Sequence, residues 1–440
     1  MSAPAESATV PLAPARPHPV VDPGSPAARV LLGIAAGDAA GWPAGRHRAH
    51  GMPAWTRRLA RELDLFAEQG GVTTLPVPVA LNQAPGPLRL GPSDDAEWAA
   101  LTAYALLDAV TPGESGVREA LDRHWAALAA QLTAPPAERA GGAPAEPPPA
   151  FRARISVRTS LANLAAGLAP PACGHDNPHY FDDAACVRAA VLATLRPGEP
   201  RAAAALAEYD ARYTQDGDGV LGARAVAAAV AAGLGGADAE GAVGAALAEL
   251  PEDTAIGRAT REAVAHARRA VGDGEGTGGS HGGDGPGPDP GTAAFALVPV
   301  LEHEIVDHVY SYGVAAAETV PVALALALAA RGRAEAALPA AACLARVADS
   351  APALTGALTG ALGAVLPAPW RAACRWLSGC AVPRIAGTDL LALAARLDAL
   401  VPLRDPPREP ARGTLREPAR LPLHEKTTAP PAGAGKDTAS

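Results

Sequence analysis

Apolar residues spaced three and four positions apart recur along most of this sequence, and no stretch of comparable length alternates as a strand would. Hydrophobic residues make up 49% of the chain, but Phe, Tyr and Trp together supply only 4%, so any core consists mainly of Ala, Leu and Val. Ala and Leu favour helices, whereas strand-forming residues are scarce. The pattern predicts an all-α protein and excludes a β-sandwich, a barrel or a large parallel sheet. We expect helices over 28–38, 96–110, 118–132, 183–195, 201–213, 223–234, 239–250, 254–271, 298–312, 319–331, 335–346, 352–366 and 388–400.

Glycine and proline are unusually frequent, with 46 and 45 copies among 440 residues. They are concentrated near 134–150, in 272–291 and after 401, and segments this rich in Gly and Pro cannot pack a core. We therefore expect a disordered leader over 1–27 and a disordered tail over 403–440. Between them, the sequence predicts a single compact helical domain over 28–402, with mobile insertions at about 134–150 and 272–291.

The charge and the cysteine content narrow the possible partners and compartments. A formal net charge of -9 argues against nucleic acid as a partner, because binding to phosphates needs clustered Lys and Arg. The five cysteines are odd in number and form no CxxC pair, which fits neither a disulfide framework nor a thiolate zinc site. The leader lacks the basic and apolar regions of a secretory signal. These features predict a cytoplasmic protein.

The uncharged stretch over 351–370 approaches the length of a membrane span and contains the helix-pairing spacing Gly356-xxx-Gly360. Its alanines, threonines and glycines make it only weakly hydrophobic. We expect this stretch to be a helix buried in a helical bundle, and we expect no membrane partner.

Three short motifs match known sites only in part. The glycines of 274–279 match the dinucleotide fingerprint, but no strand precedes them and no helix follows. His303 and His308 are five residues apart, which places them on different faces of a helix and excludes a shared zinc ion. The acidic turn at 216–219 resembles a calcium loop but has Ala225 where a bidentate Glu is required. None of the three predicts a site.

Three separated segments are polar where their helical surroundings are apolar. They are Gly37-Asp38 at the end of a small-residue helix, Ser93-Asp94-Asp95 at the start of a helix, and Asp349-Ser350 before the uncharged stretch. The second and third segments could each simply cap a helix, since hydroxyls and carboxylates are favoured at helix starts. Together these two hydroxyl-plus-carboxylate segments could instead supply the oxygen ligands that Mg²⁺ or Mn²⁺ prefers.

Taken in order, these segments resemble the ADP-ribosylglycohydrolase family. The resemblance extends along most of 28–402 and rests on Gly37-Asp38-Ala39, Ser93-Asp94-Asp95, the region 158–188, and Asp349-Ser350 followed by Gly356 and Gly360. It implies a compact all-α domain with a binuclear Mg²⁺ or Mn²⁺ centre at the base of an ADP-ribose cleft. It also implies that Ser93, Asp94 and Asp95 bind metal from one helix start and that Asp349 and Ser350 bind it from another.

The segment 170–183 lies where this family has a Gly-rich substrate loop. Gly174 could let backbone amides approach a diphosphate, while His175, Asn177 and Tyr180 offer donors and a stacking surface. The alternative is a polar loop fixed by Asp182 and Asp183. A second polar and aromatic segment, 302–312, could form a cleft wall or an internal hydrogen-bond network.

The sequence departs from the family pattern at three positions. The family commonly has an Asp two residues before the acid at 349, and this chain has Val347. A Glu often found seven residues beyond the Gly-Asp acid is Gly45 here, and the Thr that often follows the paired acids is Ala96. One metal carboxylate is therefore missing from the expected set.

The resemblance implies a metal-dependent hydrolase that cleaves the glycosidic bond joining ADP-ribose to a protein side chain or a small acceptor. Either Asp95 or Asp349 would take the proton of the attacking water. The expected partner is an ADP-ribosylated protein or a small ADP-ribose conjugate. A non-catalytic ADP-ribose or nucleotide binding protein and a purely structural helical protein remain as alternatives.

Overall fold

The computed structural model describes residues 22–49, 91–109, 113–133, 151–272, 288–306 and 313–401. These residues are helical, and the described part contains no strand beyond two isolated bridges, Asp182 with Ala315 and Trp376 with Asp389. All of them belong to one compact unit, Met1–Val401. The predicted all-α fold is confirmed. The predicted leader up to 21, most of both insertions and the tail lie outside the described residues.

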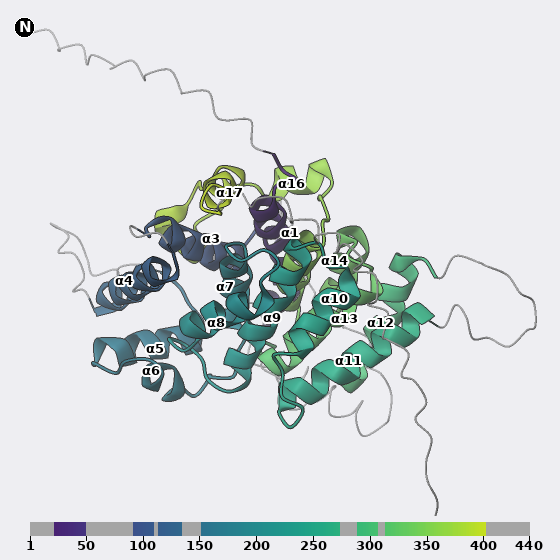
Figure 1. Ribbon diagram of the computed structural model, residues 1–440, viewed down its shortest axis with the longest axis horizontal. Coiled ribbons are helices and arrows are strands. Elements are labelled where there is room, and N and C mark those ends of the chain that lie inside the picture. Colours follow the sequence, from purple (N-terminus) through teal and green to yellow (C-terminus); the bar gives the residue numbers. More distant parts are fainter. Residues whose placement is uncertain are drawn as a thin grey trace, which may run out of the picture. The chain divides into compact units, whose positions relative to one another are not determined.

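The helices follow one another along the chain, joined by turns and loops (Figure 1). They are α1 (Pro26–Ala49), α3 (Asp94–Leu107), α4 (Glu114–Thr133), α5 (Ile155–Ala165), α6 (Ala172–His175), α7 (Ala184–Ala193), α8 (Pro200–Ala211), α9 (Asp218–Leu234), α10 (Ala239–Leu247), α11 (Ala255–Gly272), α12 (Pro290–Glu304), α13 (Ala316–Ala329), α14 (Ala334–Cys343), α15 (Ala351–Ala361), α16 (Ala368–Cys374), the 3₁₀ turn η1 (Pro383–Ile385) and α17 (Leu390–Asp398).

The buried core consists mainly of Ala, Leu and Val, as the composition indicates. Besides the four-residue α6, two helices were not expected from the sequence, α5 and α16. The first, ISVRTSLANLA, mixes polar and apolar residues without a strong stripe, and the second is only 7 residues long. Both are short enough that their contacts with longer helices, rather than their own sequences, determine their conformation.

Small residues bring α1 and α15 into direct backbone contact. A Cβ added to Gly33 would lie 2.1 Å from the Gly356 carbonyl oxygen, and one added to Gly360 would lie 2.2 Å from the Arg29 carbonyl oxygen. Gly37 meets Pro352 in the same way, at 1.9 Å. The Gly356-xxx-Gly360 spacing thus serves a contact within the domain, and no described helix is long and apolar enough to cross a membrane.

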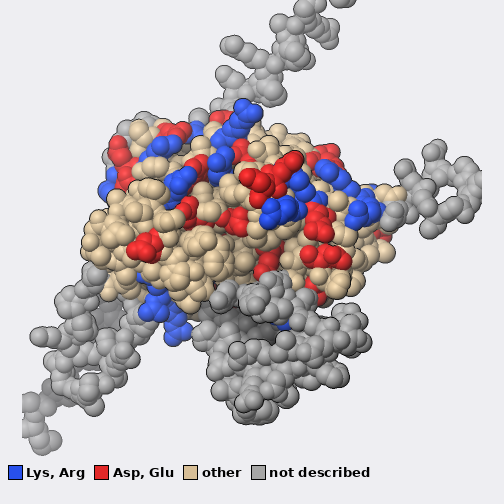
Figure 2. Space-filling model, turned by 90° about the horizontal axis from the view of Figure 1, so that it is seen from below, with Lys and Arg blue, Asp and Glu red and all other residues tan. Residues whose placement is uncertain are grey.

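The close contact between α1 and α15 fixes the place where their polar segments meet. Asp38 lies on α1 and is buried, and Ser350 stands at the N-terminal end of α15, also buried. Helix α7 packs against both of these helices, and α3 packs against α1 and α7. The core therefore holds the polar ends of several helices together. On the face drawn in Figure 2, by contrast, acidic and basic side chains lie interspersed.

Candidate functional site

Five carboxylates and one guanidinium from separate helices gather at one place, which we call the acid–arginine cluster. Asp38 comes from α1, Asp94 and Asp95 from the first turn of α3, Asp183 from the start of α7 and Asp349 from the residues before α15, while Arg154 precedes α5. The sequence predicted Asp94, Asp95 and Asp349 together. It singled out Asp38 without a role, placed Asp183 in a polar loop and missed Arg154.

The hydroxyls of the cluster do not cap the helices on which they stand. Ser93 and Ser350 are the N-cap residues of α3 and α15, yet neither side chain makes a capping hydrogen bond. Ser93 Oγ instead donates to Asp94 Oδ1 at 2.8 Å, and Ser350 Oγ donates to Asp183 Oδ1 at 3.3 Å. The structure therefore does not support the alternative that Ser93 and Ser350 are side-chain helix caps.

Asp38 caps α3 from outside that helix. Its Oδ2 accepts the backbone N–H of Ser93 at 2.7 Å and that of Ala96 at 3.0 Å. Its Oδ1 is buried and has no hydrogen-bond partner among the described residues, and the same holds for Oδ2 of Asp95 and Oδ2 of Asp183. A buried carboxylate oxygen without a partner is costly, so these atoms are candidates to bind something that is not protein.

Arg154 pairs with three of the five carboxylates, those of Asp95, Asp183 and Asp349. One terminal nitrogen lies 3.1 Å from Asp95 Oδ1 and 3.8 Å from Asp349 Oδ2, and it also donates to Ser350 Oγ. The second terminal nitrogen donates to Asp183. The Arg154 side chain is 13% exposed, so these ion pairs are shielded from water.

Burial and neighbouring charges shift the pKa values of the cluster's acids. Burial raises the pKa of Asp38 well above its ordinary value, and the charge of Asp94 raises it further. Burial also raises the pKa of Asp95, against the opposing effect of Arg154, and raises the pKa of Asp183 to about 6. Burial alone would lower the pKa of Arg154, but the surrounding carboxylates raise it. Such a site favours an added cation.

The donor atoms of the acid–arginine cluster suit a divalent ion better than their arrangement does. The donors are carboxylate and hydroxyl oxygens, which Mg²⁺ and Mn²⁺ prefer, and several of the buried oxygens lack a hydrogen-bond partner in the part of the chain that the structure describes. Within the described ranges, however, no three acidic, His or Cys side chains converge closely enough to hold an ion in this conformation. The donor chemistry fits one hard cation, and binding it would require the carboxylates to draw together.

The comparisons decide the family. The model of the ADP-ribosylglycohydrolases matches residues 22–407. This chain belongs to the ADP-ribosylglycohydrolase family. No curated protein matches the sequence significantly. A solved structure described as an "ADP-ribosylglycohydrolase-related protein complex" is similar at 19% identity, covering 86% of this chain and 98% of that chain, with a TM-score of 0.43.

Neither Val347 nor Glu97 supplies a free carboxylate oxygen to the cluster. Val347 is fully buried in the hydrophobic core. Glu97 is also fully buried, but its Oε1 accepts the backbone N–H of Cys380 and its Oε2 accepts those of Ala381 and Val382, at 2.7 to 2.8 Å. With both oxygens used to hold this loop, Glu97 is a structural residue and does not replace the missing carboxylate.

The four residues predicted to bind substrate are used in different ways. Asn177 is buried, and its side-chain amide donates to Ser156, Ser160 and Thr214. Its donors are therefore used in an internal hydrogen-bond network. Gly174 is buried as well, and a Cβ there would lie 2.7 Å from two backbone carbonyl oxygens.

The other two predicted substrate residues, His175 and Tyr180, are exposed. The His175 side chain is 75% exposed and pairs with Asp216, and Tyr180 is 43% exposed. The second polar segment is described only to 306, where His303 is exposed. Its remaining polar and aromatic residues lie outside the described residues.

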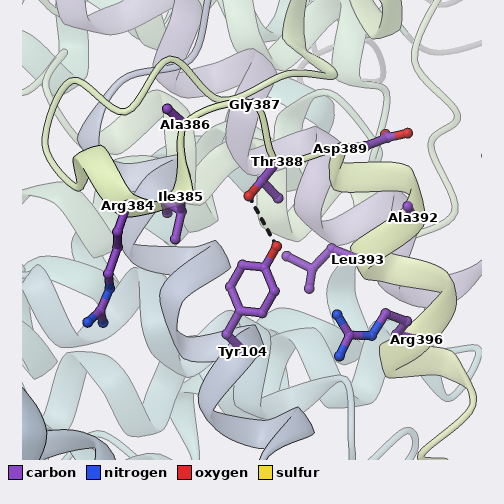
Figure 3. A pocket seen from close by; sticks show the side chains of 10 residues that line it. All are labelled: Tyr104, Arg384, Ile385, Ala386, Gly387, Thr388, Asp389, Ala392, Leu393 and Arg396. Carbon is purple, nitrogen blue, oxygen red and sulfur yellow. Dashed lines mark hydrogen bonds between the residues drawn. The ribbon is translucent and has the colours of Figure 1, made fainter. Parts of the chain in front are cut away.

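A cavity of about 500 Å³ lies between α3, η1 and α17 (Figure 3). Tyr104 stands at its centre, with its hydroxyl 3.1 Å from Thr388 Oγ1, and the guanidinium of Arg396 lies 5.9 Å from its ring centre. Tyr104 follows Asp95 by nine positions on α3, about 14 Å along the helix axis. No residue of the acid–arginine cluster lines this cavity.

Proposed function

We propose that this chain is a hydrolase dependent on Mg²⁺ or Mn²⁺ that cleaves the glycosidic bond between ADP-ribose and a protein side chain or a small acceptor. The observation that carries the proposal is the acid–arginine cluster, because several of its buried carboxylate oxygens, among them Oδ1 of Asp38 and Oδ2 of Asp95 and of Asp183, have no hydrogen-bond partner among the described residues. Structural acids are normally satisfied, whereas acids that hold a cation need not be. Membership of the family supplies the class of substrate.

In this proposal Ser93, Asp94, Asp95 and Asp349 hold the ion. Ser350, which the sequence placed in the same set, contacts Arg154 and Asp183 instead. When bound, the ion would supply Lewis-acid chemistry, orienting ribose hydroxyls and lowering the pKa of a water molecule. The donor set agrees with what hard cations prefer.

Asp349 is the better candidate for the general base. Its side chain is 24% exposed, against 6% for Asp95, so water and substrate can reach it. Asp95 is also held by Arg154 through Oδ1. In the reaction, the bond from C1″ of ADP-ribose to the acceptor would break as the water oxygen bonds to C1″. The Asp349 carboxylate would take one proton from that water and then pass it to the departing acceptor.

The test is release of free ADP-ribose from an ADP-ribosylated protein in the presence of Mn²⁺. Asp349→Asn should lower the rate by about 10²-fold or more, the scale of losing a general base. Asp253→Asn, a change of an exposed acid on a surface turn, is the matched control and should leave the rate unchanged. Equal rates for Asp349→Asn and the unmodified chain would refute the assigned role.

One observation favours a second candidate, a non-catalytic ADP-ribose binding protein. Val347 supplies no ligand, and in this conformation the described acids do not converge on a point. Under this alternative, ADP-ribose binds equally well with EDTA or with Mn²⁺ and is not released from any conjugate. The release assay and a binding titration, run side by side, distinguish the two.

A further inference from the structure

We propose that the cavity between α3, η1 and α17 is a second ligand site, separate from the acid–arginine cluster, and that it binds a small organic phosphate monoester. The inference does not rest on the proposed function, because no residue of the cluster lines this cavity. Its volume of about 500 Å³ lies within the range of about 300–1,000 Å³ that is typical of small-molecule sites.

The first support is the positive charge of the lining. Arg384 of η1 and Arg396 of α17 both line the cavity, and neither forms an ion pair with an acid in the part of the chain that the structure describes. In Figure 3 their guanidinium groups lie on either side of Tyr104. Arg stays protonated in proteins, so both charges are permanent. The cavity therefore carries two positive charges that the described residues do not neutralise.

The acid among the lining residues, Asp389, is already paired. Arg375 holds both of its oxygens, with Nε 2.8 Å from Oδ1 and a terminal nitrogen 2.6 Å from Oδ2. Asp389 Oδ1 also accepts the backbone N–H of Leu391 at the start of α17. The carboxylate points away from Tyr104 in Figure 3. Asp389 is therefore not available to neutralise the two arginines of the cavity.

Two hydroxyls add a hydrogen-bond donor to the lining. The hydroxyl of Tyr104 and Oγ1 of Thr388 lie 3.1 Å apart, and either atom can donate to the other (Figure 3). Whichever atom donates, the second hydroxyl proton has no acceptor among the described residues. Two guanidinium groups and one free hydroxyl proton make the cavity rich in donors, which favours an anionic ligand.

A phosphate monoester matches these donors better than a carboxylate does. Its phosphate group carries about −1.5 to −2 charges at pH 7 and has three acceptor oxygens, enough for both guanidinium groups and the hydroxyl. A carboxylate carries one charge and has two oxygens. The planar fork of an arginine also suits phosphate geometry.

The apolar part of the lining suits the organic portion of the ester. Ile385 and Leu393 are buried and line the cavity, and the ring of Tyr104 stands between the charged groups (Figure 3). Small-molecule sites commonly combine such apolar surface with a few polar groups that fix the ligand's orientation. A free phosphate ion would leave this surface unused.

Hydrogen bonds fix the segment that forms this wall of the cavity. The Leu377 N–H donates to the Thr388 carbonyl oxygen at 3.1 Å, and the Gly387 N–H donates to the Leu377 carbonyl oxygen at 2.8 Å. The Leu390 N–H donates to the Arg375 carbonyl oxygen at 3.0 Å. A site that is formed before the ligand arrives loses less conformational entropy on binding.

The experiment is a calorimetric titration of the full chain with phenyl phosphate in EDTA, which prevents phosphate from binding through a metal ion. The unmodified protein should bind one phenyl phosphate per chain. Arg384→Gln and Arg396→Gln should each weaken binding by about 10-fold or more, the scale of one charge-assisted hydrogen bond. Arg201→Gln is the matched control, because Arg201 is exposed on α8 and does not line the cavity. It changes the net charge equally and should bind as the unmodified protein does.

Three outcomes would overturn the site. They are no binding of phenyl phosphate, unchanged binding in both Arg384→Gln and Arg396→Gln, and equal weakening by Arg201→Gln. Because Arg384 and Arg396 are exposed, we expect both variants to keep the circular dichroism spectrum of the unmodified protein.

Phenol and inorganic phosphate test the two parts of the ligand separately. Phenol lacks the anion and should not bind, and inorganic phosphate lacks the ring and should bind more weakly than phenyl phosphate. Either compound binding as tightly as phenyl phosphate would overturn the assignment of an ester. None of these results changes the expected release of ADP-ribose, so this inference and the proposed function fail independently.

Discussion

Replacing Gly356 by alanine should destabilise the domain and weaken the cluster together. The new Cβ would lie 1.9 Å from the Gly33 carbonyl oxygen, whereas contacts under 3.0 Å are essentially never seen, so α1 and α15 must move apart by about 1 Å. Overpacking of this kind costs about 1–3 kcal/mol, and a contact with rigid backbone belongs at the upper end. The higher helix propensity of Ala returns about 1 kcal/mol. We expect a net loss of about 2 kcal/mol.

Urea unfolding followed by circular dichroism measures this loss. Gly244→Ala on α10 is the matched control, because a Cβ there meets nothing within 4 Å, and it should stabilise the protein by about 0.4–1 kcal/mol. Since Asp38 is carried by α1 and Ser350 begins α15, Gly356→Ala should also lower the affinity for Mn²⁺. Equal stabilities for Gly356→Ala and Gly244→Ala would refute the close contact between the two helices.

Three further predictions concern single measurements. Asp94→Asn should lower the affinity for Mn²⁺ in calorimetry with little loss of melting temperature in the metal-free protein, since it removes the charge that raises the pKa of Asp38 and of Asp95. ADP-ribose should raise the melting temperature more than AMP does, because the distal ribose lies beside the ion; equal shifts would indicate a generic nucleotide site. Burial lowers the pKa of His124 to about 4, so the unfolded chain binds more protons between about pH 4 and 6.5 and stability should rise with pH there. His124→Gln should flatten that part of the pH profile measured by urea unfolding, and an unchanged profile would contradict the burial of His124.

The helical spacing was enough to predict the fold class and most helix positions, because amphipathic stripes are local features. It was not enough for α5, whose sequence mixes polar and apolar residues, or for the continuation of α1 beyond Asp38 through Gly41. Gly41 would ordinarily weaken a helix, but a Cβ there would lie 1.9 Å from the Ala348 carbonyl oxygen, so the close packing of α1 requires a glycine. Tertiary contact overrides local preference at this position.

Local patterns predicted the site only where its residues are neighbours in sequence, and Asp349 was joined to them through the family resemblance. Ser93, Asp94 and Asp95 form a recognisable group, but Arg154 is 59 positions from Asp95 and 196 from Ser350. No local pattern marks an arginine that fills the space between acids from other helices. The sequence also predicted a residue for the site that serves another purpose. Asn177 has the chemistry of a ligand-binding residue, yet its donors are used within the protein.

The central claim is that the acid–arginine cluster supports metal-dependent hydrolysis, and one measurement tests it most directly. The full chain is incubated with an ADP-ribosylated protein, with Mn²⁺ or with EDTA, and free ADP-ribose is quantified by chromatography over time. Our account predicts steady release with Mn²⁺ and release at the uncatalysed rate with EDTA. Release that is equally fast in EDTA, or no release under either condition while ADP-ribose still binds, would contradict it.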